Sequence, residues 1–258
     1  MALSAAGVER IAAAAHAAGR QAGVVHNFLG LPAHAGLRRL LDGGWLGRLF
    51  DLRVDWALPF APLQSGPYGI WPLRETGHLL WEIAPHPLSF AVDLLGPVDV
   101  LHLETGQMRE IPGLGPRPQA FRLLARSGPV EVTIALSFVQ THEERALTLR
   151  GSSGLARLDY GRDRLTVTGD NASGLVINPL RRGLSLAMQE AGQSLRLAGR
   201  ESLSLHRRTP YGESFRGTLA GFYGALRAGR ADPRFAPEAA LAVARAIEAA
   251  VARLPAAP

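Results

Sequence analysis

The chain has 258 residues, which is long enough for one large domain or two small ones with a buried core. Hydrophobic residues make up 47% of it and charged residues 19%, a composition typical of globular rather than disordered proteins. Cysteine is absent, which excludes disulfides, thiolate metal sites and cysteine nucleophiles. All 28 basic residues are arginine, so a catalytic lysine is excluded as well.

The net charge of +6 does not by itself predict nucleic-acid binding. The arginines are scattered along the chain, whereas nucleic-acid-binding domains gather their basic residues on one face. No apolar run reaches the ~18 residues that a membrane helix needs. The opening sequence MALSAAGVER has neither the basic nor the apolar region of a secretory signal. We therefore expect a cytoplasmic protein that binds neither nucleic acid nor membranes.

The first part of the chain alternates helix and strand signals. Ser4 is predicted to cap an alanine-rich helix that ends at Gly19. A short apolar strand is predicted over 23–26. Pro32 is predicted to open a second helix, which the glycines at 43–44 end.

The period then changes from helical to alternating. Apolar residues at every second position from Phe50 to Leu58 predict a strand with one buried face. Further strands are predicted near 97–104, 119–126, 129–139, 145–150, 155–159 and 164–168, with a helix over part of 78–95. A second set of helices closes the chain: a helix-like insertion at 183–199, a helix with the stripe Phe215, Leu219, Phe222 and Leu226, and a last helix opened by Pro237. This order predicts an α+β fold, in which helices cover one face of a largely antiparallel, open sheet.

The segment 75–97 carries the chemistry. Glu82 and His86 are four residues apart, which on a helix places them on one face, and a carboxylate beside an imidazole suits general acid–base work. The same spacing occurs on ordinary polar helix faces, so spacing alone leaves both interpretations open. His78 adds another step of four, but His78 and His86 would lie about 12 Å apart on a regular helix, which is too far for one metal ion. No metal site is predicted. The other histidines have no such neighbours and are interpreted as surface or structural: His16, His34, His102, His142 and His206.

Segment 76–96 resembles the signature of the C-terminal domain of the Gfo/Idh/MocA oxidoreductases (glucose–fructose oxidoreductase, inositol dehydrogenase and relatives). His86 falls on the family histidine, Glu82 on its first aspartate and Ser89 on its second. Thr76-Gly77-His78 falls on the glycine triplet, and Ala84 and Gly96 fall on later glycines. Residues 23–47 resemble the stretch that follows the family's dinucleotide-binding half, 150–159 its hairpin, and the tail its closing helices. The resemblance covers essentially the whole chain.

The resemblance implies a division of the chain and a site. Residues 1–45 correspond to the end of the nucleotide-binding domain, and 46–258 to the substrate and oligomerisation domain, whose open sheet face would form a homodimer or homotetramer. His86 and Glu82 would be the catalytic pair. The predicted substrate-binding residues are His78, Tyr68, Trp71 and Arg74, which border the family's pocket, and His26 and Asn27, which end the strand that enters its cleft. An aromatic wall with an arginine would suit a sugar-like or carboxylated ligand. Anchoring of the loop, and a structural role for His26, are the alternatives.

Two features of the family pattern are missing from this sequence, and their absence bears on which function it can have. The dinucleotide motif Gly-x-Gly-x-x-Gly is absent, because Gly113-x-Gly115 lacks its third glycine, and so is the Glu-Lys-Pro lysine. We therefore predict no cofactor for this chain, and expect NAD(P) only if a partner chain supplies the Rossmann domain.

The first hypothesis is a cofactor-independent enzyme of the lyase or isomerase type. It would use His86 and Glu82 for isomerisation, dehydration, epimerisation or cyclisation of a small oxygenated substrate, in a biosynthetic pathway. The alternative is the substrate-binding half of an NAD(P)-dependent oxidoreductase whose Rossmann domain is a separate chain. A non-catalytic binding or assembly protein is the third.

Overall fold

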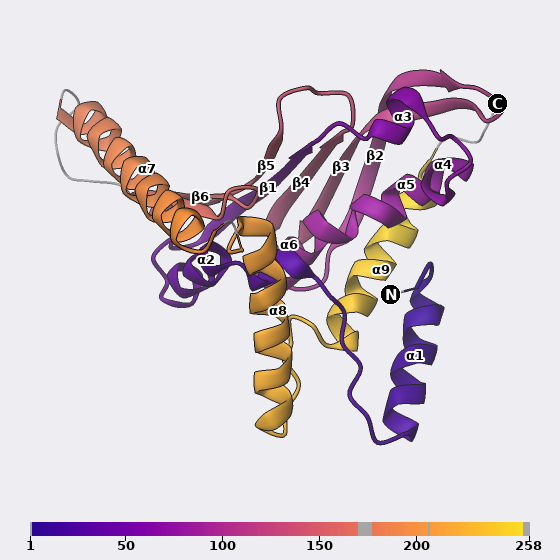
Figure 1. The fold of residues 1–258 in the computed structure, drawn as a ribbon, viewed down its shortest axis with the longest axis horizontal. Helices are drawn as coiled ribbons and strands as arrows, with labels where there is room; N and C mark the ends of the chain where they lie inside the picture. The colour runs from indigo at the N-terminus through magenta and orange to yellow at the C-terminus, as the bar shows by residue number, and fades with distance from the viewer. Residues whose placement is uncertain (1, 170–176, 206, 255–258) are drawn as a thin grey trace.

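A seven-stranded sheet forms the centre of the molecule (Figure 1). The computed structural model describes residues 2–169, 177–205 and 207–254, so that His206 lies outside the described residues. The strand order is β2-β3-β4-β1-β5-β6-β7, and within this part of the chain β1 and β4 are the one parallel pair. The strands are β1 (Leu49–Ala57), β2 (Asp99–Ile111), β3 (Gly115–Ser127), β4 (Val130–Ser137), β5 (Glu144–Gly151), β6 (Gly154–Asp159) and β7 (Arg164–Gly169). The prediction of a largely antiparallel, open sheet with helices is confirmed.

The helices predicted to begin after Ser4, at Pro32 and at Pro237 begin there. Ser4 Oγ accepts a hydrogen bond from the Gly7 N–H at 3.0 Å, and Gly19 follows the first helix with φ of +62°. Prolines stand in the first turn of α2, α6, α8 and α9. The helical elements are α1 (Ala5–Ala17), η1 (Asn27–Gly30), α2 (Pro32–Asp42), α3 (Ala61–Ser65), α4 (Trp71–Arg74), α5 (Thr76–Ile83), α6 (Pro85–Leu95), α7 (Ile177–Leu203), α8 (Pro210–Arg227) and α9 (Pro237–Val251).

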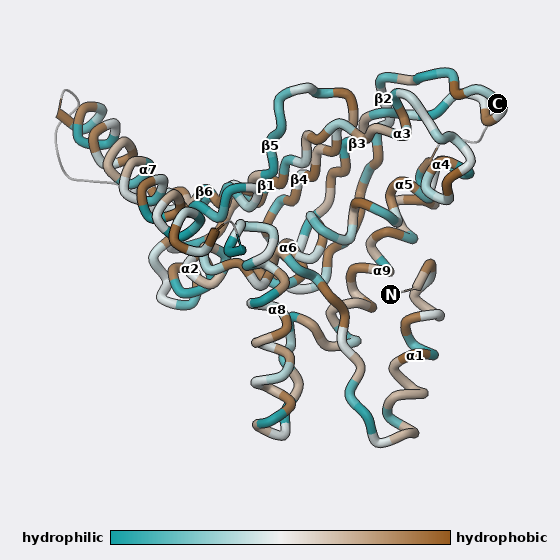
Figure 2. The backbone as a smooth tube through the Cα atoms, viewed as in Figure 1, coloured by the Kyte–Doolittle hydropathy of each residue, from teal (hydrophilic) through white to brown (hydrophobic). Residues whose placement is uncertain are grey.

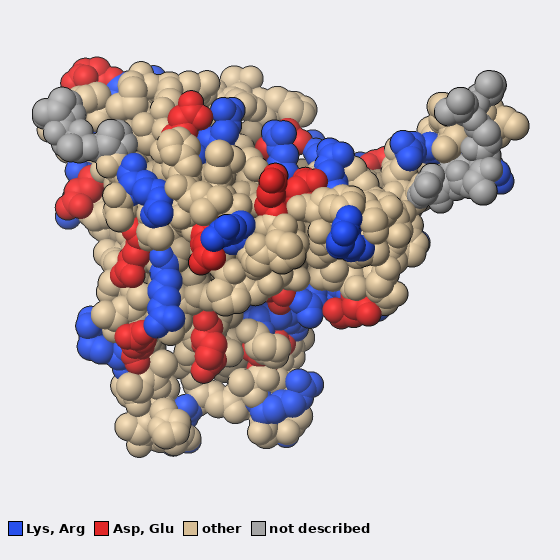
Figure 3. All heavy atoms as spheres, turned by 180° about the vertical axis from the view of Figure 1, so that it is seen from behind, with Lys and Arg blue, Asp and Glu red and all other residues tan. Residues whose placement is uncertain are grey.

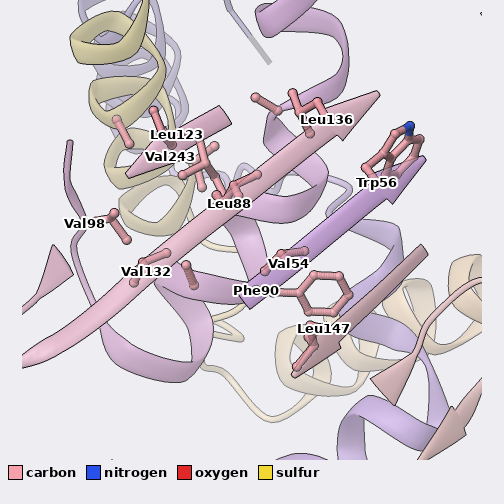
Figure 4. Packing of buried hydrophobic residues seen from close by; sticks show 14 of the residues in the cluster. Val54, Trp56, Leu88, Phe90, Val98, Leu123, Val132, Leu136, Leu147 and Val243 are labelled. Atoms are coloured by element: carbon pink, nitrogen blue, oxygen red, sulfur yellow. The ribbon is translucent and has the colours of Figure 1, made fainter. Parts of the chain in front are cut away.

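The core lies between the sheet and the helices α6 and α9. Val54 of β1 and Leu88 of α6 are fully buried, and Val243 of α9 joins the same cluster (Figure 4). Burial of one such side chain contributes about 1.5–3 kcal/mol. The alternating pattern of β1 and β4 therefore points its apolar residues toward these helices.

The other face of the sheet is polar. Arg53 forms an ion pair with Asp55 at 2.9 Å on β1, and Arg122 of β3 pairs with Glu104 of β2 at 3.4 Å. Arginine and acidic side chains are interspersed over the molecule seen from behind (Figure 3). The apolar side chains of 130–138 lie under the helices, so they do not supply an apolar open face. Phe50 departs from the expected pattern, because a register irregularity after Leu49 leaves it 45% exposed.

The strand predicted over 23–26 is wrong. The segment is irregular, and a hydrogen bond from the Val24 N–H to the Phe235 carbonyl, 2.8 Å long, is its one backbone bond to another part of the described chain. It runs between α1 and α8, which project from the same side of the sheet (Figure 1). A strand needs a neighbour to pair with, and the described residues place none beside it.

Helix α8 docks through small and polar residues. Asn27 Nδ2 donates to Ser214 Oγ at 3.0 Å, and Thr218 Oγ1 donates to the Asn27 carbonyl at 3.2 Å. The predicted apolar stripe is not the buried face, because Leu219 is 48% exposed and Leu226 is 40% exposed. The backbone of α8 packs closely against the backbone of η1. Small residues of α8 therefore face η1, and the larger apolar residues of the predicted stripe do not form the buried face.

Helix α7 turns its hydrogen-bonding side to the sheet. Gln193 bonds both the N–H and the C=O of Leu165 on β7, at 2.7 and 2.6 Å, and Gln189 bonds both groups of Val167, each at 2.9 Å. The predicted helix at 183–199 is thus part of a longer helix that covers the β7 edge. Hydrophobic and hydrophilic stretches alternate along it in Figure 2. Exposed apolar residues lie along α7: Ile177, Leu180, Leu184, Met188 and Leu195.

Replacing both glutamines by methionine is expected to release the β7 edge. Four hydrogen bonds to the strand backbone would be lost, each contributing about 1 kcal/mol. Amide hydrogen exchange at Leu165 and Val167 should accelerate by about tenfold or more, as measured by NMR or mass spectrometry. Leu195→Gln, an exposed position of the same helix, is the control. Unchanged exchange in the Gln189→Met, Gln193→Met variant would show that the glutamines do not hold the edge.

Candidate functional site

The two predicted catalytic residues lie on successive helices. Helix α5 ends at Ile83 and α6 begins at Pro85, whose ring cannot continue a preceding helix. Ser89 Oγ donates to the His86 carbonyl at 2.8 Å and fixes the first turn of α6. Glu82 is exposed, and within the described part of the chain no hydrogen bond or ion pair joins it to His86. The expected carboxylate–imidazole contact is therefore not formed.

Aromatic rings hold the His86 imidazole instead. It stacks on Trp56 of β1, with ring centroids 5.3 Å apart and planes 9° apart, and Phe28 of η1 packs edge-on at 5.3 Å. Burial, and secondly the positive charge of Arg145, lower the pKa of His86 from 6.5 to about 4. The imidazole is thus neutral at pH 7.

Arg145 is a residue that the sequence did not reveal. Its guanidinium carbon lies 5.7 Å from the Phe28 ring centroid and 5.8 Å from that of Trp56, the two rings that pack on His86. No local motif marks it. The strand register could have found it, because Arg145 is opposite Trp56 in the β1–β5 pair.

His26 supplies a second imidazole. It is 4% exposed, and its Nε2 has no hydrogen-bond partner in the described residues. Burial, and secondly the neighbouring His86, lower the pKa of His26 to about 4. This ring nitrogen is therefore available for a hydrogen bond with a bound molecule.

His26 and His86 open on one cavity of ≈ 340 Å³. Trp71, Trp81 and Glu82 also line it, so four predicted site residues (His26, Trp71, Glu82 and His86) come together there. The rest of the wall is aliphatic or proline and comes from α1 and the residues before it, the 24–25 segment, α6 and α9: Ala2, Leu3, Val8, Val24, Val25, Pro85, Ala240, Val243, Ala244 and Ile247.

The other predicted substrate-binding residues lie outside this cavity. The His78 ring stacks on the Trp71 ring with their centroids 4.8 Å apart, and His78 Nδ1 lies 3.1 Å from the Trp71 carbonyl oxygen. These contacts fix the position of Trp71. Arg74 Nε donates to the Gly69 carbonyl at 3.3 Å, and Tyr68 packs against the core, as loop anchoring predicts. Asn27 fastens α8.

His34 has an acidic neighbour that the sequence did not indicate. Its Nε2 lies 3.2 Å from Asp93 Oδ2, with both side chains buried between α2 and α6. The pair is away from the cavity, which agrees with the structural interpretation of this histidine.

Gly113 and Gly115 do not form a dinucleotide-binding turn. Gly113 lies in the turn between β2 and β3, and Gly115 begins β3, so neither stands in a turn from strand to helix, where backbone N–H groups would bind phosphates. No group of three or more histidine or acidic side chains suited to a metal is found among the described residues. Nor is any described helix both long and apolar enough to cross a membrane.

Comparisons with known proteins give the chain a family and show which solved structures share its fold. The family model for the GFO/IDH/MocA C-terminal domain matches residues 34–173, more than half of the chain. The fold is similar to that of an oxidoreductase from Agrobacterium radiobacter solved with NAD+, L-tartaric acid and magnesium (18% identity, TM-score 0.67, 97% of this chain and 67% of that one). It is also similar to an NAD-binding oxidoreductase from Klebsiella pneumoniae (17%, 0.73, 98% and 69%) and to the WlbA dehydrogenase from Bordetella pertussis solved with NADH and UDP-GlcNAcA (15%, 0.66, 98% and 68%).

No curated protein sequence matches the chain. The similar structures share only its fold at these identities, and the chain spans about two thirds of their length. The matched region contains the α5–α6 junction with His86. The chain therefore belongs to the Gfo/Idh/MocA family and contains its C-terminal domain.

Proposed function

We propose that this chain is the substrate-binding part of a Gfo/Idh/MocA oxidoreductase whose dinucleotide-binding domain is a separate polypeptide. The observation that carries the proposal is the 23–26 segment. Its sequence is that of a strand, yet the described residues offer it no strand to pair with. Because Val24, Val25 and His26 also line the cavity, a sheet that pairs with this segment would lie directly beside His86.

Exposed apolar side chains near this segment support docking of a second domain. Val25 is 51% exposed, and Leu3 and Ile11 on the α1 side are exposed as well. Tyr223 of α8, the neighbouring helix that projects from the same side of the sheet, is also exposed. Apolar surface of this kind marks interaction sites when it gathers around a segment that lacks its own partner.

In this proposal the chain binds and orients the substrate. Trp71 and Trp81 form aromatic walls, and the neutral His86 imidazole accepts a hydrogen bond from a substrate hydroxyl. His26 is placed for a second hydrogen bond through its unpartnered Nε2. The redox chemistry belongs to the domain outside these residues.

The site favours this function over cofactor-independent acid–base chemistry. General acid–base catalysis works best when the catalytic pKa lies near the operating pH, but both histidines have a pKa of about 4. Glu82 has no contact with His86 that would raise its basicity. Family membership points the same way, because the similar structures include oxidoreductases solved with NAD+ or NADH. A homodimer through the ion-paired sheet face stays a prediction.

Co-expression tests the proposal. The chain is produced with a neighbouring gene product that carries a strand–Gly-x-Gly-x-x-Gly–helix motif. The two are expected to co-purify, and NAD(H) should bind to the complex but not to the chain alone in calorimetry. Val25→Asp should weaken association about tenfold or more, because it places a charge on the apolar docking surface, whereas Leu184→Asp on α7 should not. Turnover by the chain alone, lost in His86→Ala, would favour the cofactor-independent hypothesis instead.

A further inference from the structure

We propose that the cavity between α2, β7 and α7 is a second binding site, and that it accepts a phosphate monoester with an apolar body. The cavity has a volume of ≈ 580 Å³ and shares no lining residue with the cavity at His86. It lies at the β7 end of the sheet, where α7 runs beside α2 (Figure 1). The inference goes beyond the proposed function, because it concerns a different part of the chain.

Three arginines line this cavity from two helices. Arg39 comes from α2, and Arg196 and Arg200 come from α7. Gln193 bonds the β7 backbone from the inner face of α7. The two arginines follow it at positions i+3 and i+7, so the helical period places them on the same face. Asp163 is the one acidic residue in the lining.

The negative charge of Asp163 is already compensated. Its side chain is 2% exposed, and its Oδ1 accepts a hydrogen bond from the Ala33 N–H, 2.9 Å away in the first turn of α2. Its Oδ2 accepts one from Arg200 Nη1 at 3.0 Å. The guanidinium groups of Arg39 and Arg196 are exposed and have no ion pair or hydrogen bond within the described residues. Two positive charges therefore remain uncompensated at the cavity.

The surrounding helices do not supply the missing negative charge. Three of their acidic residues are paired with other arginines: Asp42 with Arg38, Glu190 with Arg164, and Glu213 with both Arg208 and Arg216. Arg200 also keeps unused donors, since its Nε and Nη2 are buried without a partner in the described residues. A guanidinium stays protonated and has no acceptor atom, so only an acceptor can satisfy these groups. The cavity thus combines positive charge with free hydrogen-bond donors.

A phosphate monoester matches this arrangement. It carries close to two negative charges at pH 7, and guanidinium groups bind phosphate through parallel N–H bonds. Apart from the two glutamines, whose amides bond β7, the rest of the wall is apolar: Pro32, Ala33, Leu165, Met188, Gly192 and Leu197. An apolar body attached to the phosphate would cover this surface. A free organic phosphate and the head group of phosphatidic acid share this chemistry.

Calorimetry on the full chain at pH 7 tests the site with three molecules that share one ring system and differ in charge. They are 1-naphthyl phosphate, 1-naphthyl sulfate with a single charge, and neutral 1-naphthol. The phosphate should bind about tenfold more tightly than the sulfate, because it meets both uncompensated arginines, and naphthol should bind most weakly. In about 1 M salt the preference for the phosphate should largely disappear, since the Debye length falls to about 3 Å.

Variants place the binding in this cavity. Arg39→Gln and Arg196→Gln should each weaken binding of naphthyl phosphate about tenfold, with an unchanged circular dichroism spectrum because both side chains are exposed. Arg181→Gln makes the same charge change at an exposed position of α7 outside the lining and should leave binding unchanged.

Vesicles of phosphatidylcholine with phosphatidic acid distinguish the two sources of the phosphate. Co-sedimentation that is lost in Arg196→Gln would assign the site to a lipid head group, and its absence, with naphthyl phosphate bound, to a free phosphate. Equal affinity for the phosphate and naphthol, an equal loss in Arg181→Gln, or no heat of binding with millimolar naphthyl phosphate would overturn the inference. No dinucleotide or second chain is present, so these outcomes are separate from those of the proposed function.

Discussion

Replacing Gly217 by alanine is expected to lower the free energy of unfolding by about 3 kcal/mol. A Cβ at this position would lie 1.8 Å from the Gly30 carbonyl oxygen, which is backbone and cannot rotate away. The hydrogen bonds of Asn27 to Ser214 and of Thr218 to Asn27 hold η1 and α8 at this distance. Overpacking between two fixed backbones costs about 1–3 kcal/mol and sometimes more. Urea unfolding curves followed by circular dichroism measure the change.

Gly224 offers a matched control on the same helix. A Cβ there would meet nothing within 4 Å. Gly224→Ala should therefore leave stability unchanged or raise it by about 0.5–1 kcal/mol, since alanine favours the helix over glycine. Equal effects of the two substitutions would show that the close approach of α8 to η1 is not what holds the helix.

Acidification from pH 7 to pH 4 is expected to destabilise the fold through His26 and His86. Both have a pKa of about 4 in the folded chain, against 6.5 as the ordinary value. Below pH 6.5 the unfolded chain takes up protons that the folded chain refuses, so stability present above pH 6.5 is lost progressively as the pH falls to about 4. The loss is roughly 3 kcal/mol for each histidine.

Single substitutions separate the two contributions. In His86→Gln one titrating group is removed, so the fall in unfolding free energy between pH 6.5 and 4 should shrink by about half, as should the fall in His26→Gln. His16→Gln, on α1 and away from the cavity, should behave as the unaltered chain. A fall of the same size in all four proteins would assign the acid sensitivity to other groups.

Elements whose signals lie within their own residues could be predicted from the sequence, because they do not depend on a neighbouring element. The alternation in 130–138 predicted β4, and the caps at Ser4 and Pro32 predicted α1 and α2, because these signals lie within the element itself. The 23–26 strand failed because strand formation depends on a neighbour. The prediction of the buried face of α8 was wrong, because the close approach of Gly217 to Gly30 buries the small residues of the helix in place of the larger apolar ones.

The candidate site was readable only in part for the same reason. The segment 75–97 indicated Glu82 and His86, and both line the cavity, but Pro85 separates them onto two helices. The groups that set the state of His86 come from elsewhere in the chain. Trp56, Phe28 and Arg145 meet it only once β1, η1 and β5 are in place.

The glutamines of α7 limit how this sheet can grow. They occupy the backbone groups of Leu165 and Val167, so another strand cannot add beside β7 without first displacing a whole helix. At the opposite margin, Arg253 bonding the Leu101 carbonyl is the one side chain that the described residues place on the β2 backbone from outside the sheet. Any strand-by-strand extension, whether in assembly or in aggregation, is thereby directed to the β2 side.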